Sequence, residues 1–131
     1  MDDLYCVNFY DNTNVIELKR NDFNKKKTGF VNKKYIGING IIVFYSNLCL
    51  HCKNTYNTLI NIADMYKNKF NIYTVNCNNL EYKNDYLIRD FQITQYPQFK
   101  LINNNKINKL KLKNHNIENI MYIIDNNLKT K

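Results

Sequence analysis

Apolar residues occur along the chain in short runs that are typical of β-strands. These runs are rich in β-branched and aromatic side chains, and polar residues or glycine separate them. The predicted strands are Val15–Leu18, residues 41–46, Ile72–Val75, Phe99–Ile102 and Ile107–Leu112. The triple asparagine at positions 103–105 is too short a link for a crossover, so the last two strands are predicted to be antiparallel.

Other apolar residues recur at intervals of three and four, the spacing of one buried helix face. This pattern predicts a long helix from Cys52 to near Asn68, a shorter helix over residues 82–91 and a final helix over residues 117–128, with Asn114 or Asn116 as its cap. A further short helix is expected at residues 22–27, with Asn21 as its N-cap.

The order of these elements predicts an α/β protein. A helix joins the strands at 41–46 and 72–75, which therefore run parallel through a right-handed crossover, and the final hairpin adds antiparallel strands. We expect a central mixed sheet of about five strands flanked by about four helices. Residues 13–131 form one domain, and residues 1–12 are an N-terminal arm or, through Leu4–Tyr10, an extra edge strand.

Composition narrows the class of protein. The chain has 131 residues, enough for one domain with a substantial core, and 44% of them are hydrophobic. The net charge of +8 is spread over dispersed lysines with little arginine, which argues against nucleic-acid binding. No basic leader and no apolar stretch of ~18 residues is present, so we expect a cytoplasmic protein without a membrane anchor.

The strongest chemical feature is the segment Cys49-Leu50-His51-Cys52. It lies where an apolar strand gives way to a helical pattern, so Cys49 falls at a helix N-terminus, where unpaired N–H groups and the helix dipole favour a thiolate. Cys52 lies one turn later on the same face and can form a disulfide with Cys49. This spacing predicts reversible thiol–disulfide exchange.

Two other interpretations of the cysteine pair stay open. Two thiolates at this spacing are half of a tetrahedral zinc site, but no second paired motif supplies the rest, and the single candidates Cys6, Cys77, His51 and His115 are scattered. The pair could also be structural, with buried and inert thiols. We therefore expect no metal and no other cofactor.

In this order and spacing, four segments resemble the thioredoxin family, most closely one catalytic domain of a protein disulfide isomerase. These segments are Val15–Leu18 with Asn21-Asp22-Phe23, the stretch from Ile42 to Lys53, Val75-Asn76-Cys77, and Phe91-Gln92-Ile93-Thr94-Gln95-Tyr96-Pro97-Gln98. The resemblance implies a thioredoxin fold over nearly the whole chain. It also implies protein thiols and disulfides as substrates.

Three positions depart from the family pattern. Leu48 replaces the usual tryptophan before the first cysteine, which reduces the aromatic docking surface. Val43 stands where the family buries an acid that moves protons to and from the second cysteine, and Thr74 replaces a lysine often found near that acid. We therefore expect neither half of the buried pair, a loss that leaves no unpaired charge.

The resemblance assigns roles to the site residues. Cys49 is the nucleophile and Cys52 resolves the mixed disulfide, while Leu50 and His51 tune the redox potential. His51 could instead only cap a surface helix.

Pro97 is expected to be cis and to face the cysteines, leaving the Tyr96 backbone to bind an extended client beside Leu48. Alternatively, Pro97 only begins a strand and blocks one ladder bond.

Two functions follow from these assignments. The first is a monomeric, cofactor-free thiol–disulfide oxidoreductase, recharged by an unidentified reductase or oxidase. The second is a redox-weak binding module that holds client chains on the same scaffold.

A cytoplasmic protein with an isomerase-like site is unusual, because disulfides normally form in secretory compartments. The Asn- and Lys-rich composition suggests one explanation, which is an origin in a large DNA virus with packaging of the protein in the virion.

Overall fold

The computed structural model describes residues 8–129, and strands and helices make up about half of them. In order, the elements are β1 (Ile16–Glu17), a 3-10 turn (Arg20–Asp22), β2 (Gly40–Tyr45), α1 (Leu50–Asn54), α2 (Tyr56–Met65), β3 (Asn71–Asn76), α3 (Asp85–Asp90), β4 (Gln98–Asn103), β5 (Lys106–Lys109) and α4 (Ile117–Lys129).

The five strands form one mixed sheet in the order β1-β3-β2-β4-β5. β1 and β2 run parallel to β3, whereas β4 runs antiparallel to both β2 and β5. All six residues of β2 are buried, as expected for a central strand with both faces covered. The predicted α/β class, the five-stranded mixed sheet and the four flanking helices are confirmed.

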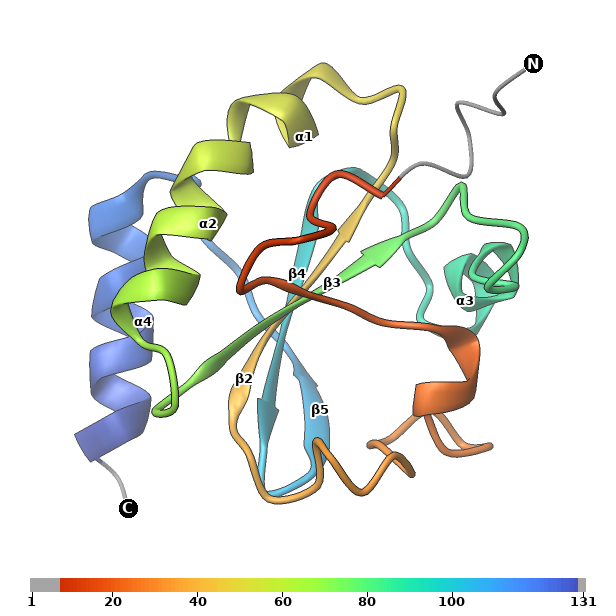
Figure 1. The fold of residues 1–131 in the computed structure, drawn as a ribbon, viewed down its shortest axis with the longest axis horizontal. Helices are drawn as coiled ribbons and strands as arrows, with labels where there is room; N and C mark the ends of the chain where they lie inside the picture. Colours follow the sequence, from red (N-terminus) through yellow and green to blue (C-terminus); the bar gives the residue numbers. More distant parts are fainter. Residues whose placement is uncertain (1–7, 130–131) are drawn as a thin grey trace.

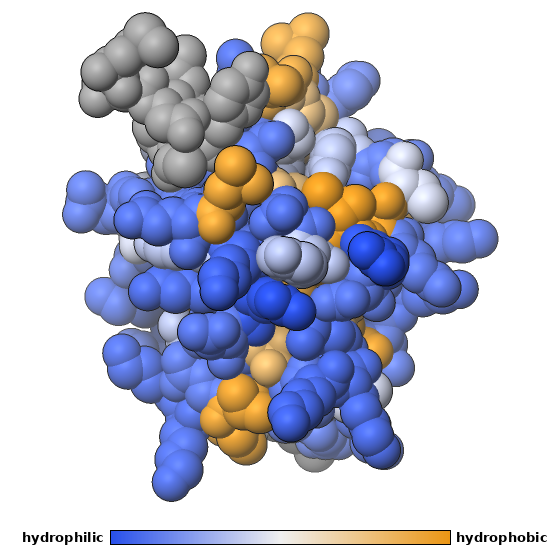
Figure 2. All heavy atoms as spheres, turned by 90° about the vertical axis from the view of Figure 1, so that its right-hand side faces the viewer, coloured by the Kyte–Doolittle hydropathy of each residue, from blue (hydrophilic) through white to orange (hydrophobic). Residues whose placement is uncertain are grey.

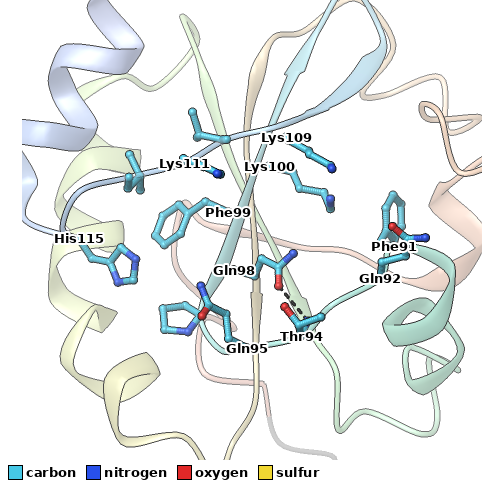
Figure 3. Close-up of a pocket in the computed structure, with 13 residues that line it drawn as sticks. Phe91, Gln92, Thr94, Gln95, Gln98, Phe99, Lys100, Lys109, Lys111 and His115 are labelled. Atoms are coloured by element: carbon cyan, nitrogen blue, oxygen red, sulfur yellow. Dashed lines mark hydrogen bonds between the residues drawn. The ribbon is translucent and has the colours of Figure 1, made fainter.

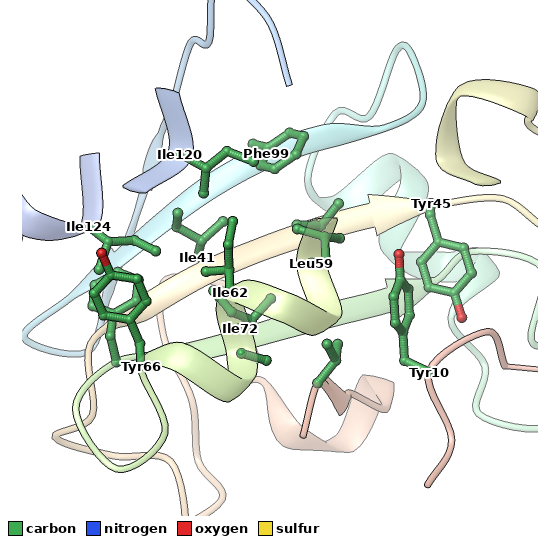
Figure 4. Close-up of a cluster of buried hydrophobic side chains, with 14 of the residues drawn as sticks. Tyr10, Ile41, Tyr45, Leu59, Ile62, Tyr66, Ile72, Phe99, Ile120 and Ile124 are labelled. Atoms are coloured by element: carbon green, nitrogen blue, oxygen red, sulfur yellow. The ribbon is translucent and has the colours of Figure 1, made fainter. Parts of the chain in front are cut away.

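Helices cover both faces of the sheet, with α2 and α4 on one side and α3 on the other (Figure 1). Two hydrophobic clusters fill these layers. Figure 4 shows the first, where Leu59 and Ile62 of α2 and Ile120 and Ile124 of α4 lie over Ile41 of β2. The second cluster packs the opposite face against α3, through residues such as Ile42, Phe44 and Leu87.

The short helix predicted at residues 22–27 is wrong. A 3-10 turn ends at Asp22, and the chain then folds back so that Phe23 pairs with Phe30 in an isolated bridge. The Asp22 side chain accepts from Lys19 N, and the Asn24 side chain accepts from Thr28 N. Such local side-chain bonds to the backbone compete with a helix, and here they stabilise turns.

The long helix predicted from Cys52 is interrupted at Thr55, which ends α1 and begins α2. Thr55 Oγ1 donates to the Cys52 carbonyl at 2.9 Å, a side-chain bond to the preceding turn that bends helices. The final helix follows the prediction, because Asn116 Oδ1 accepts from Asn119 N at 2.9 Å and so caps α4.

The fifth strand ends at Lys109, earlier than the predicted Leu112. Leu110 and Leu112 pack against the first hydrophobic cluster, so the chain leaves the ladder to bury them.

The predicted edge strand at Leu4–Tyr10 lies mostly outside the described residues, as does Cys6. Its described end, Asn8–Tyr10, is held by hydrogen bonds to side chains of β2, β3 and β1.

The first cluster should dominate stability. Ile62→Ala removes a fully buried side chain and is expected to lower the free energy of unfolding by about 2–5 kcal/mol, measured by urea denaturation. Met65→Ala is the matched control, because Met65 lies on the same helix and is 53% exposed. Equal losses for the two variants would contradict this packing.

Candidate active site

The site begins where β2 ends, in the segment Ser46–Cys49. Asn78, in the turn after β3, holds this segment: its Oδ1 accepts from Ser46 Oγ at 2.6 Å and from Asn47 N at 2.8 Å. Leu48 N in turn donates to Ser46 Oγ at 3.2 Å. The sequence analysis missed Asn78, although an asparagine just after the third strand lies at the same sheet end as the cysteines.

Cys49 is the N-cap of α1, and its Sγ accepts from Cys52 N at 3.2 Å. In the thiol form, Cys49 Sγ also donates to the Tyr96 carbonyl oxygen at 3.4 Å. The two sulfurs lie in different environments, because Cys49 is half-buried whereas Cys52 is buried, and both thiols are free. The structure thus brings the predicted pair together as a dithiol with one accessible sulfur.

Burial is the main cause that raises the pKa of Cys52 far above that of an ordinary thiol. A hydrogen bond from the Cys52 thiol to Cys49 raises this pKa further. Cys52 therefore keeps its proton at neutral pH while donating towards Cys49. The roles of Cys49 as nucleophile and Cys52 as resolving thiol stay a prediction.

Tyr96 and Pro97 lie beside the thiols, and their peptide bond is cis. Pro97 is buried, and Gln98 begins β4 directly after it. The Tyr96 hydroxyl forms a hydrogen bond with Cys77, and burial raises the pKa of Cys77 to about 12. Cys77 is thus a protonated, buried thiol, as expected for a core cysteine.

Leu48 and Leu50 flank Cys49 and are each 71% exposed. His51 is also exposed, on α1. Burial lowers the pKa of His115, and the charge of His51 lowers it further. The redox-tuning role of Leu50 and His51 stays a prediction.

A half-buried acid, Glu17, lies on the edge strand β1. Glu17 of β1 is the register partner of Thr74, which is itself paired with Val43, so the three residues form one row across the sheet. The Glu17 carboxylate accepts from Tyr45 OH, from Thr74 Oγ1 at 2.9 Å and from Tyr10 N at 3.2 Å. Neither half of the family's buried pair is present at Val43 and Thr74, as expected, but a carboxylate on the neighbouring strand lies in the same row.

Burial raises the pKa of Glu17 to about 7, although its three hydrogen bonds oppose the shift. Between Glu17 and Cys52 lie Tyr10 and Thr55, whose side chains are hydrogen-bonded to each other. The signal in the sequence was a single carboxylate inside the apolar strand Val15–Leu18.

Within residues 8–129, no three His, Cys, Asp or Glu side chains converge as metal ligands. The described helices are all too short or too polar to span a bilayer.

The raised pKa of Glu17 predicts a pH-dependent stability. Its folded pKa of about 7 exceeds the unfolded value of roughly 4.3. The folded state therefore binds more protons, and stability falls as pH rises from about 4.5 to 7. We expect this site to cost about 1–3 kcal/mol at pH 8 relative to pH 4.5.

Glu17→Gln removes this titration. Urea denaturation between pH 4.5 and 8 should show that the stability of the variant minus that of the wild type grows with pH. The lowered pKa of His115 acts in the opposite direction, but it is common to both proteins and cancels in the difference. Parallel pH profiles would contradict the assignment.

Comparison with known proteins agrees with this geometry. The family model described as Thioredoxin matches residues 14–126. A search of curated proteins gave no match.

Among solved structures, the J-Trx1 fragment of ERdj5 has a TM-score of 0.71 and 18% sequence identity. The match covers 92% of this chain and 55% of the fragment. The Trx4 domain of ERdj5 has a TM-score of 0.67 and 21% identity, with 91% of this chain and 99% of that chain covered. The first thioredoxin domain of mouse protein disulfide-isomerase A4 has a TM-score of 0.68 and 17% sequence identity. The match covers 88% of this chain and 76% of that domain's chain.

This chain spans about half of the first of these structures. Its structural neighbours are thioredoxin domains of the protein disulfide isomerase type, and they show the fold alone. The match to the Thioredoxin model covers most of the sequence, so the chain belongs to the thioredoxin family.

Proposed function

We propose that this protein is a thiol–disulfide oxidoreductase that exchanges disulfides with protein substrates. The observation that carries the proposal is the unequal pair of thiols: Cys49 caps a helix at the surface and Cys52 lies protonated behind it. Membership of the thioredoxin family supports the same chemistry.

The reaction needs two displacements. The Cys49 thiolate attacks a client disulfide, so that a bond from Cys49 to the client forms, the client disulfide breaks, and one client sulfur leaves as a thiolate. Cys52 loses its proton and attacks Cys49 Sγ, which forms the Cys49–Cys52 disulfide and releases the second client sulfur. The client gains two electrons and the protein loses two, and the reverse sequence oxidises a client dithiol.

Neighbouring groups are suited to hold the client. Leu48 and Leu50 offer exposed apolar contacts on either side of the nucleophile. Pro97 cannot donate a backbone hydrogen bond, and the Tyr96 carbonyl lies 3.4 Å from Cys49 Sγ, within reach of an extended client. We propose that an unidentified reductase or oxidase recharges the pair, and that the protein acts as a cytoplasmic monomer.

The test is reduction of insulin by the wild type, Cys49→Ser and Cys52→Ser, with mass spectrometry of quenched samples under non-reducing conditions. The wild type should turn over, Cys52→Ser should accumulate a mixed disulfide with insulin, and Cys49→Ser should do neither. Equal and negligible turnover by the wild type and Cys49→Ser would instead favour a client-binding module, for which the exposed Leu48 and Leu50 are the supporting observation.

A further inference from the structure

A groove of about 490 Å³ begins at Pro97 and extends along β4 beyond the end of β5. Figure 3 shows its walls: Phe99 and His115 on one side, Phe91 and Gln92 on the other, and lysines at the far end. The thirteen lining residues include no Asp or Glu and three lysines, Lys100, Lys109 and Lys111.

Lys100 is the unusual member of this set. Its side chain is only 8% exposed, yet it lies on a strand between β2 and β5, where the sheet core is expected. Burial, and then the charge of Lys109, lower the pKa of Lys100. Within residues 8–129 it has no carboxylate partner, and its Nζ lies over the Phe91 ring, 6.0 Å from the ring centroid.

The two neighbouring lysines, Lys100 and Lys109, lower the stability of the fold when no anion lies near them. The stem of Lys100 is buried while its ammonium faces the groove, and like charges directly opposite each other on neighbouring strands repel. Lys100 and Lys109 are such a cross-strand pair. Lysines at a sheet edge also prevent aggregation, which accounts for the exposed Lys109 and Lys111 but not for the buried Lys100.

The remaining walls suit a peptide. His115 stacks on Phe99, with ring centroids 4.8 Å apart, and its lowered pKa leaves the ring uncharged at neutral pH. Lys100 to Asn103 are paired with β5, whereas Gln98 and Phe99 lie beyond the end of that pairing. The groove therefore combines an apolar ring wall, a strand that extends past its neighbour, and a group of cations.

We propose that this groove binds an acidic segment of the client protein, adjacent to the disulfide that Cys49 attacks. The inference rests on the proposed function, because it places the client disulfide at Cys49. A client that crosses Tyr96 and Pro97 meets the groove at the next residue, Gln98. Asp or Glu side chains a few residues from its cysteine then reach Lys100 and Lys109, where they neutralise the uncompensated charge.

The test uses two short peptides that contain the same intramolecular disulfide. One carries aspartates beside a cysteine, and the other carries asparagines at those positions. Second-order rates of reduction by the reduced protein are measured at low and physiological salt. In parallel, fluorescence anisotropy measures binding of cysteine-free, labelled versions of both peptides.

Lys100→Met and Lys109→Gln test the groove, and Lys67→Gln is the matched control. The control removes the same unit of charge from an exposed position next to the start of β3, at the end of that strand remote from the cysteine segment. We expect the wild type and Lys67→Gln to prefer the acidic peptide about tenfold, as for one charge-assisted contact, and each groove variant to lose most of that preference.

Each outcome decides between the two proposals. Equal rates and equal binding for the two wild-type peptides, or a preference that Lys100→Met and Lys109→Gln leave intact, overturn the acidic-client inference while reduction itself sustains the oxidoreductase. Binding that prefers the acidic peptide without reduction of either peptide supports the groove and removes the proposed reaction. Lys109 is exposed, so Lys109→Gln keeps the test valid even where Lys100→Met fails to fold.

Discussion

β2 lies at the centre of the sheet, and its antiparallel pairing with β4 governs where the reactive groups meet. Phe44 is paired with Gln98, so the segment before β4 returns to the end of the sheet at which β2 stops. Pro97 and the Tyr96 carbonyl thereby lie beside Cys49, although 47 residues separate Tyr96 from Cys49 in the chain. The parallel pairing of β2 with β3 brings Asn78 to the same end, where it holds the loop that carries the thiol.

The two thiols differ because the fold gives them different surroundings. Cys49 lies half-buried at the rim, and Cys52 lies one turn deeper against the first hydrophobic cluster. Desolvation keeps Cys52 protonated, and its N–H and thiol both donate to the Cys49 sulfur. The difference in burial between the two sulfurs is what the proposed exchange reaction depends on.

The face of the molecule on which α3 lies is predominantly polar. Figure 2 shows hydrophilic side chains over most of this face, with hydrophobic groups in small separate areas. Among the described residues, Lys100 is the one lysine that is both buried and part of the groove beside Pro97. Its position opposite Lys109 is unfavourable unless an anion lies near them, which is why the proposed acidic client is placed there.

The sequence by itself determined the central strands, the last helix with its Asn116 cap, and the positions of Cys49, Cys52 and Pro97, because local periodicity and short motifs carry that information. The turn after Asp22 and the break at Thr55 rest on local side-chain bonds to the backbone, which hydrophobic periodicity does not reveal. Only the tertiary structure decided the early end of β5, because the burial of Leu110 and Leu112 ends the ladder. The contacts of Glu17, Asn78 and Lys100 also depended on tertiary structure, because strand pairing brings together residues far apart in the sequence. Burial then shifts the pKa of Glu17 and of Lys100.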